Sequence, residues 1–186
     1  MRTGTPIHEP FQGARIGAFY VLAPSPRRYL DLILQSEKTP ESTEASPAQT
    51  EPSGLLGALQ TAVEFITSKW GDERFSPEGT SAENEMSVVQ FAQIADHRIL
   101  LTGDAGREGL GEAADFLEAS GVSLPGIDVF QVPHHGSRRN VSTEILDRLL
   151  GPRMLFAPGD PKFTAVFSAS KQDRDHPKKA VVRACY

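Results

Sequence analysis

Ile127-Asp128-Val129-Phe130-Gln131-Val132 runs directly into Pro133-His134-His135-Gly136-Ser137. The apolar half of this stretch has the composition of a buried β-strand. Pro133 interrupts strand hydrogen bonding, and Gly136 permits a sharp turn. The two imidazoles are therefore expected at the end of a strand, where α/β proteins usually build their functional sites.

A second strand candidate, residues 98–102, ends in a similar way with Gly103 followed by Asp104. Taken alone, a Gly-Asp pair is common in ordinary turns, and a histidine pair is more often a structural feature of a core. Taken together, a carboxylate and two imidazoles suit Zn²⁺, with Mn²⁺ or Fe as alternatives, and a metal-bound water ionises near neutral pH. We therefore predict a divalent metal site that draws on Asp104, His134 and His135.

The composition limits the class of protein. The chain has 186 residues, 39% of them hydrophobic, which predicts a single domain over 1–186. A formal net charge of −5 argues against a general polyanion-binding surface. The lone Cys185 excludes an internal disulfide and suits a reducing compartment. No signal peptide and no membrane-spanning run is visible, so we expect a cytoplasmic protein with no membrane partner.

The pattern of elements predicts an α/β fold with a mixed sheet. We expect a strand at 16–22, then a helix capped by Ser25 whose apolar face comprises Tyr29, Leu30, Ile33 and Leu34. A polar segment at 36–53 is interpreted as a flexible insertion within the domain. The other expected elements are a helix over 55–66, a polar loop over 71–86, a hairpin of strands 87–94 and 98–102, a helix over 108–119 with Leu110, Ala113, Ala114 and Leu117 inward, a strand over 127–132, a helix over 143–150 capped by Ser142, strands at 154–157 and 165–168, and a helix opened by Pro177.

Four further residues are candidates for contacts with a substrate. His176 precedes the last expected helix, and its alternative role is that of a capping or surface histidine. Asn84 precedes a strand and can turn toward the site. Arg138 is suited to bind a phosphate, although a solvated basic turn is an equal alternative. Ser137 is interpreted as a turn hydroxyl or a substrate contact, because no Gly-x-Ser-x-Gly elbow surrounds it to make it a nucleophile.

These motifs together resemble a known family. Asn84-Glu85-Met86-Ser87-Val88-Val89, Leu100-Leu101-Thr102-Gly103-Asp104-Ala105-Gly106, Gln131-Val132-Pro133-His134-His135-Gly136-Ser137-Arg138, Ser168-Ala169-Ser170 and His176-Pro177 occur in the order seen in the C-terminal half of metallo-β-lactamase-fold hydrolases. The subgroup they resemble most is similar to the hydrolase domain of competence (DNA-uptake) proteins. The resemblance implies a partial αββα sandwich and a metal-bound hydroxide that attacks a phosphoester or a nucleic-acid-type substrate.

The resemblance also implies individual roles. Asp104 would bridge two metal ions, and either His134 or His135 would bind the second of them. His176 would contact the substrate or assist the leaving group, so Asp104 and His176 are the predicted catalytic residues. Asn84 would occupy a position where the wider superfamily often has a ligand histidine.

One expected motif is missing from the sequence. The family carries His-x-His-x-Asp-His in the N-terminal half of its domain, and this chain has no His-x-His. We therefore expect metal to bind weakly to this chain alone, because a zinc ion normally takes three or four protein ligands. A partner chain or self-association would complete the site. The alternative is a non-catalytic binding or assembly module derived from the same fold.

Overall fold

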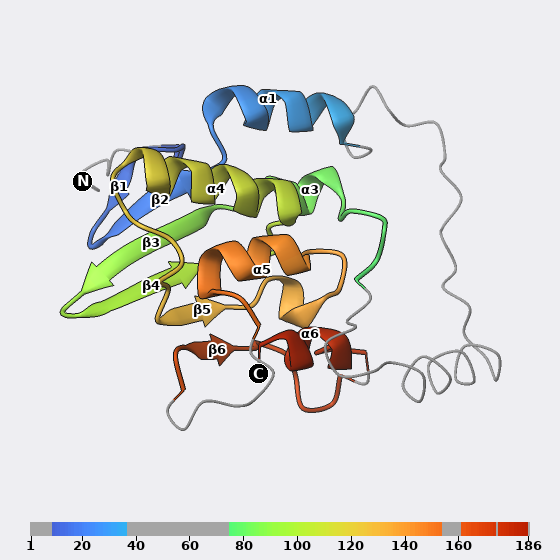
Figure 1. Ribbon diagram of the computed structural model, residues 1–186. Helices are drawn as coiled ribbons and strands as arrows, with labels where there is room; N and C mark the ends of the chain where they lie inside the picture. Colours follow the sequence, from blue (N-terminus) through green and yellow to red (C-terminus); the bar gives the residue numbers. More distant parts are fainter. Residues whose placement is uncertain (1–8, 37–74, 154–160, 174, 186) are drawn as a thin grey trace, which may run out of the picture.

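The computed structural model describes residues 9–36, 75–153, 161–173 and 175–185. Over these ranges the chain is an α/β protein with a six-stranded sheet in the order β1-β2-β3-β4-β5-β6 (Figure 1). The described elements are β1 (Arg15–Ile16), β2 (Phe19–Ala23), α1 (Pro26–Gln35), α3 (Ala82–Glu85), β3 (Val89–Ile94), β4 (His97–Leu101), α4 (Arg107–Ala119), β5 (Val129–Gln131), α5 (Thr143–Leu150), β6 (Thr164–Val166) and α6 (Lys179–Ala184).

The mixed character of the sheet is confirmed. Strands β1 to β4 pair antiparallel, whereas β5 and β6 pair parallel to the strand before them. The predicted hairpin is β3 and β4, which are in register from Gln90 opposite Leu101 to Ile94 opposite His97. Strand β5 is shorter than predicted, since the N–H of Ile127 donates outside the sheet, to the carbonyl of Leu149.

Two predictions near the N-terminus are wrong. The single strand expected over 16–22 is divided into β1 and β2 by a turn at Gly17, whose φ of +62° suits glycine. In α1 the Ser25 cap is confirmed, because its side chain accepts from the N–H of Arg28. The apolar face is not as predicted, since Leu30 and Leu34 are 61% and 83% exposed. The helix instead turns Leu32 inward, on the side from which Arg28 reaches the carboxylates of α3 and α4.

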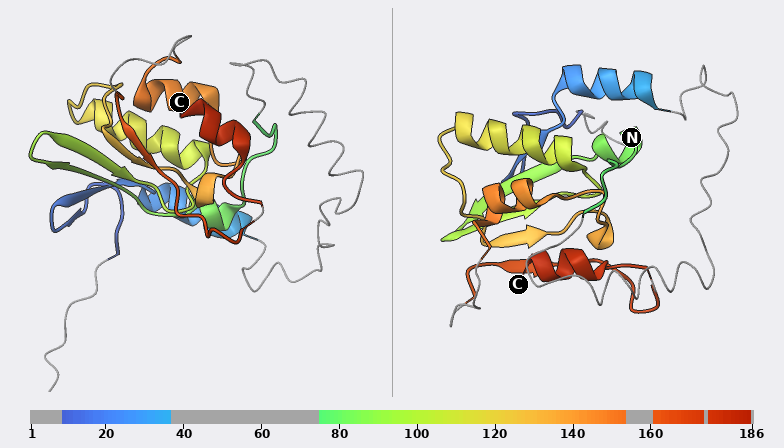
Figure 2. Two further views of the ribbon diagram at one scale, coloured as in Figure 1. Left: turned by 90° about the horizontal axis from the view of Figure 1, so that it is seen from below. Right: turned by 45° about the vertical axis from the view of Figure 1, so that its right-hand side comes forward.

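Helix α4 covers one face of the sheet. The four side chains predicted to face inward, Leu110, Ala113, Ala114 and Leu117, are all buried. The helix packs on β2 and β3, and α5 lies beside it on the same face (Figures 1 and 2). Ser142 caps α5 as predicted, by accepting from the N–H of Ile145. The main core therefore lies between the sheet and these two helices.

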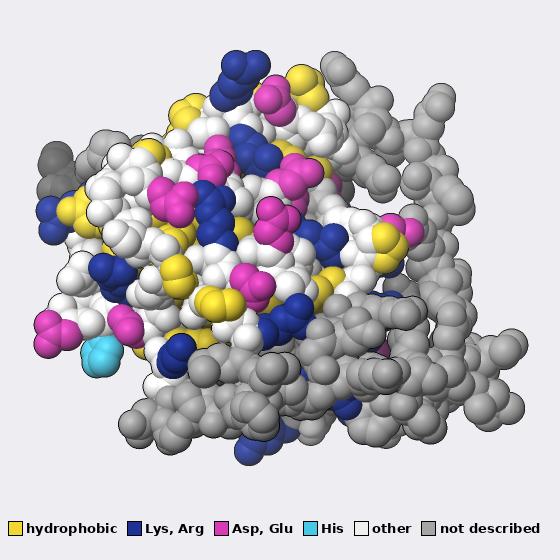
Figure 3. Space-filling model, viewed as in Figure 1, with side chains coloured by type: hydrophobic (Ala, Val, Ile, Leu, Met, Phe, Trp, Pro, Cys, Tyr) yellow, Lys and Arg dark blue, Asp and Glu magenta, His cyan; other side chains and the backbone are white. Residues whose placement is uncertain are grey.

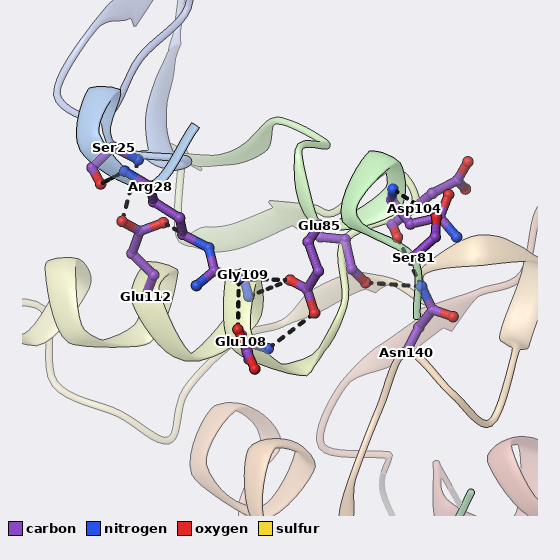
Figure 4. Close-up of polar contacts among 11 residues, drawn as sticks. Ser25, Arg28, Ser81, Glu85, Asp104, Glu108, Gly109, Glu112 and Asn140 are labelled. Atoms are coloured by element: carbon purple, nitrogen blue, oxygen red, sulfur yellow. Dashed lines mark hydrogen bonds and ion pairs between the residues drawn. The ribbon is translucent and has the colours of Figure 1, made fainter. Parts of the chain in front are cut away.

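A carboxylate from another helix closes the N-terminus of α4. The N-cap of α4 is Gly106, which has no side chain to accept a hydrogen bond. Glu85 of α3 supplies the missing acceptor. Its carboxylate accepts from the N–H of Gly109 at 2.7 Å and from that of Glu108 at 3.4 Å (Figure 4). Arg28 of α1 donates to the same carboxylate at 3.1 Å. Glu85 thus joins α1, α3 and α4, and the expected polar loop over 71–86 contains a short helix that carries it.

The second face of the sheet is of mixed polarity and only partly covered. Ladder partners share a face of a sheet and side chains alternate along each strand, so the register places one set of side chains on the face opposite α4. We call its aliphatic members the open face: Ile94, Ile99, Leu101, Val129 and Val166. Ile94 and Val166 are 46% and 43% exposed, and the other three are half-buried. The same register places Ala92 and the polar side chains of Gln90, His97, Gln131 and Thr164 among them.

The C-terminal elements differ slightly from expectation. The last helix begins at Lys179 rather than Pro177, and β6 covers only the first part of the strand predicted at 165–168. The strand expected at 154–157, the helix at 55–66 and the insertion beyond Ser36 lie outside the described residues.

Within the described ranges, none of the helices has the length and apolar character needed to cross a bilayer. On the face seen in Figure 3, basic and acidic side chains are interspersed.

Candidate active site

The His-His-Gly turn (His134–Gly136) has an unusual backbone. His134, His135 and Gly136 have φ values of +46°, +57° and +89°, in a region that residues with a side chain rarely adopt. Such strain persists only where the surroundings enforce it, and it concentrates at functional sites. Here the N–H of His134 donates to the carbonyl of Gly103 at 3.1 Å, and the N–H of Lys178 donates to the carbonyl of Gly136 at 3.1 Å.

Close packing explains the glycine in this turn. A Cβ at position 136 would lie 2.7 Å from Cβ of Pro177 and 2.9 Å from Cδ1 of Phe167. Glycine is therefore required both for the backbone conformation and for the approach of the C-terminal segment. That approach brings His176, which is far away in sequence, to the histidine pair.

Three imidazoles converge at this point, and we call them the histidine cluster: His134, His135 and His176. The ring centroids of His134 and His176 lie 6.0 Å apart in a stacked arrangement. His135 lies 5.9 Å from His134 and 6.3 Å from His176, with its ring steeply inclined to both. His135 is exposed, and the other two are half-buried. The cluster is thus accessible from solvent.

Each ring has a polar neighbour that orients it. Nδ2 of Asn84 lies 3.0 Å from Nδ1 of His134, and Oγ of Ser168 lies 3.2 Å from Nδ1 of His135. Nδ1 of His176 lies 3.3 Å from Oδ2 of Asp173. The Asp173 carboxylate also accepts from the N–H groups of residues 175 and 176, which hold its pKa below the usual range. All three Nδ1 atoms are therefore directed at protein groups.

Asp104 lies beside the cluster at the end of β4. Its N–H donates to Oγ of Ser87 at 3.2 Å, and its carbonyl accepts from Nδ2 of the fully buried Asn140 at 2.7 Å (Figure 4). Burial lowers the pKa of His134, and the charge of Asp104 opposes that shift in part. His134 is consequently neutral at pH 7, as a ligand, a base or a neutral hydrogen-bond donor has to be.

Ser137 and Arg138 occupy the end of the turn. Oγ of Ser137 accepts from the N–H of Arg139 at 3.3 Å, which is the turn-hydroxyl role considered for it. Arg138 is exposed. Its backbone carbonyl accepts hydrogen bonds from the N–H of Ser76 and from the Arg107 guanidinium. The substrate contacts predicted for Ser137 and Arg138 stay predictions.

The described residues do not make a metal site by themselves. Within ranges 9–36, 75–153, 161–173 and 175–185, no three His, Cys, Asp or Glu side chains are grouped in a way that would hold a metal ion. Nδ1 of His134 is in contact with Asn84, and Nδ1 of His135 with Ser168. The donor set present therefore does not fit the zinc, manganese or iron ion that the resemblance implies, unless other groups complete it.

Sequence reasoning missed two residues that organise this site. Asp173 stands three residues before His176, and a carboxylate at that spacing in a turn is a recognisable signal for an oriented histidine. Asn140 gives no such signal, because its partners are the carbonyls of residues 104 and 105, which are distant in sequence. The contact between the two predicted turns, by contrast, is as expected.

Comparisons with protein families, with curated proteins and with solved structures found no match to this chain.

Proposed function

We propose that the histidine cluster hydrolyses phosphoesters, including nucleic-acid-type substrates, in a domain of the metallo-β-lactamase type. The observation that carries this proposal is the convergence of three imidazoles, two of them on a strained turn, beside the carboxylate of Asp104. A structural histidine pair does not require two consecutive residues in the left-handed region. Strained backbone and a shifted pKa at one accessible point favour chemistry over packing.

His134 is assigned to the substrate oxyanion. The amide nitrogen of Asn84 carries hydrogens only, so its contact makes Nδ1 of His134 the acceptor and leaves the ring proton on Nε2. A neutral imidazole with a proton on Nε2 donates a hydrogen bond to a phosphoryl oxygen as negative charge develops. Burial supports this role, because it keeps the ring neutral.

His176 is assigned to proton transfer. Asp173 accepts from Nδ1 of His176, and this contact directs Nε2 away from the carboxylate. In that tautomer Nε2 takes a proton from the attacking water, and the protonated ring then donates it to the leaving oxygen. Asp173 fixes the orientation of the ring through both steps.

The metal centre belongs to the same proposal but not to the described residues alone. Asp104, His134 and His135 are the predicted metal ligands, but in the tautomer assigned above His134 has no free nitrogen, so a divalent ion would use Asp104 and His135 and would need further ligands from elsewhere in the chain or from a partner chain. The roles of His134 and His176 do not depend on a metal ion.

The open face supports the finer assignment of the fold. In a sandwich, the inner faces of two sheets are apolar and pack about 10 Å apart. The aliphatic side chains of the open face have this character, and they lie opposite the face that α4 covers. We propose that a second sheet, supplied by a partner chain or by a second copy, packs there and completes an αββα arrangement.

Hydrolysis of bis(4-nitrophenyl) phosphate tests the proposed activity. We expect His176→Ala and Asp104→Asn to lower the rate about 100-fold or more. Asp96→Asn is the control, because Asp96 is exposed at the turn between β3 and β4, and the rate should not change. Parallel assays with Zn²⁺, Mn²⁺ or EDTA measure whether a metal ion takes part.

Two results together would contradict the proposal. They are an inactive wild-type chain and an absence of any shift in the ring signals of His134 and His176 when inorganic phosphate is added. Equal activity in His176→Ala would by itself reject the role of that residue.

The open face also favours a second function, that of an assembly module without catalysis. Such a module would associate through the aliphatic side chains of β3 to β6. Light scattering should then show a dimer or a heterologous complex, and Ile94→Lys with Val166→Lys should abolish it, because both side chains are at an exposed part of the face. A stable wild-type monomer would contradict this alternative.

A further inference from the structure

Arg107, the first residue of α4, joins three segments of the chain through their backbone carbonyls. Its Nε donates to the carbonyl of Val141 at 3.0 Å, and its Nη2 donates to the carbonyl of Arg138 at 3.1 Å and to that of Ser76. Nε and Nη2 form one edge of the planar guanidinium group, so these contacts fix where the 138–141 segment lies relative to α4. The N–H of Ser76 donates to the same Arg138 carbonyl at 3.4 Å. The backbone of Arg138 is therefore held from two sides.

Asn140 makes the same kind of contact in the opposite direction. Its Nδ2 donates to the carbonyls of Asp104 and Ala105, which belong to the turn between β4 and α4 (Figure 4). Arg107 reaches from the end of that turn to carbonyls of the 138–141 segment, and Asn140 reaches from the segment to carbonyls of the turn. The two parts of the chain that border the histidine cluster are thus fixed to each other by a side chain from each.

The predicted phosphate contact, Arg138, lies on the segment that Arg107 holds. A guanidinium group binds a phosphoryl group through paired hydrogen bonds, and these tolerate little misplacement of the backbone that carries the side chain. We propose that Arg107 is a positioning residue for substrate binding, which sets the affinity for the phosphoryl group by holding the backbone of Arg138. This inference rests on the proposed hydrolysis and adds to it a residue that does not touch the substrate.

Hydrolysis of bis(4-nitrophenyl) phosphate by Arg107→Ala separates positioning from stability. We expect KM to rise about tenfold and kcat to change by less than about twofold, because a misplaced Arg138 weakens binding of the ground state and the transition state alike. Partial unfolding would instead lower kcat and leave KM unchanged, since fewer molecules would be active. Arg98→Ala is the matched control. Nη1 of Arg98 also donates to a backbone carbonyl, that of Ser123 at 3.0 Å, but at the opposite end of β4 from Asp104, so KM should not change.

Two further variants identify how Arg107 acts. Arg107→Lys keeps the positive charge but loses the planar group that spans two carbonyls, so most of the rise in KM should remain. Arg138→Ala removes the side chain but keeps the carbonyl that Arg107 holds, so it should raise KM by itself. Because Arg107 acts through Arg138, the double variant Arg107→Ala with Arg138→Ala should have the same KM as Arg138→Ala. The Kd of inorganic phosphate, measured from the ring signals of His134 and His176, should change in parallel.

The possible results distinguish this inference from the proposed function. If wild type hydrolyses the ester, an unchanged KM in Arg107→Ala would overturn the inference alone. Full recovery of KM in Arg107→Lys would do the same, because the charge of Arg107 would then be sufficient. Additive losses in the double variant, or a loss confined to kcat, would also overturn it. A wild-type chain that neither hydrolyses the ester nor binds phosphate would overturn both the inference and the proposed function.

Discussion

Nδ2 of Asn84 lies 3.0 Å from Nδ1 of His134, and the same nitrogen donates a 2.7 Å hydrogen bond to Oγ1 of Thr80. The two contacts use both hydrogens of the amide, so Asn84 sets the tautomer of His134 as well as its orientation. Asn84→Asp replaces these donors by a carboxylate only a few ångströms from the ring. We expect the pKa of His134 to rise, because a nearby negative charge stabilises the imidazolium ion.

An NMR titration of the His134 ring measures this change, with Asn84→Ala as the neutral comparison. Asn84→Ala removes the hydrogen bond without adding a charge, so any rise should be smaller than in Asn84→Asp. The same pKa in the two variants would show that Asn84 does not control the ring.

The lowered pKa of His134 makes stability depend on pH. The unfolded chain binds a proton to this histidine near pH 6.5, whereas the folded chain resists protonation because the ring is partly buried. The unfolded state therefore holds more protons as pH falls through 6.5, and folding stability falls with it. Well above pH 6.5, His134 is neutral in both states, and its effect on the free energy of unfolding does not vary with pH.

Urea unfolding between pH 7.5 and 5 checks the direction. His134→Gln should flatten the decline of unfolding free energy below pH 6.5. His97→Gln is the control, because that histidine is exposed in the β3–β4 hairpin. A decline of the same slope in wild type and His134→Gln would contradict the assignment.

The fold and the site were predictable from the sequence to different extents. Local patterns were sufficient for the β3–β4 hairpin and for the buried face of α4, since period-2 and period-3.6 hydrophobicity report burial directly. The pattern failed for α1, where Leu30 and Leu34 are exposed. The orientation of that helix follows the ion pairs of Arg28 with Glu85 and Glu108, which connect residues far apart in sequence.

The site shows the same division. The strand-end turns that carry Asp104 and His134 were recognisable because glycine and proline mark where strands end. Their contact through Gly103 was implied by the resemblance, but the support from Asn140 and Asp173 was not. Asn140 acts through two backbone carbonyls, which leave no mark on the sequence, whereas Asp173 contacts the side chain of His176 three residues away and was recognisable from that spacing.

Two glycines near the start of α4 should respond oppositely to alanine. A Cβ at Gly106 would lie 1.9 Å from Oε1 of Glu85 and 2.6 Å from Cγ2 of Thr80, so Gly106→Ala must displace the carboxylate that caps the helix. We expect a loss of about 1–3 kcal/mol in unfolding free energy. A Cβ built at Gly111 would have no neighbouring atom within 4 Å, so Gly111→Ala should stabilise α4 by about 0.5–1 kcal/mol. Thermal or urea denaturation compares the two, and equal effects would contradict the capping role of Glu85.

Asn140 should matter for the position of Asp104 as well as for stability. Its Nδ2 donates to the carbonyls of Asp104 and Ala105, and its side chain is fully buried. Asn140→Ala leaves both carbonyls without this donor, at a cost of about 1–3 kcal/mol. Asn140→Asp should cost more, because a carboxylate cannot donate and repels the carbonyl oxygens. Denaturation measures both variants, and a smaller loss in Asn140→Asp would contradict this account.

Cys185 should be almost inert while α6 stays packed. Burial against the core raises the pKa of its thiol to about 12, whereas an exposed cysteine has a pKa near 8.5. The reactive thiolate is therefore about 10³-fold scarcer at pH 8 in the folded protein than in the unfolded chain. Alkylation by iodoacetamide, followed by mass spectrometry with and without urea, measures the difference directly, because the chain has no other cysteine.

Val181→Ala should accelerate alkylation, since Val181 is fully buried in α6 and its truncation loosens the packing of that helix. Similar rates in native and unfolded protein would mean that α6 detaches faster than the reagent reacts.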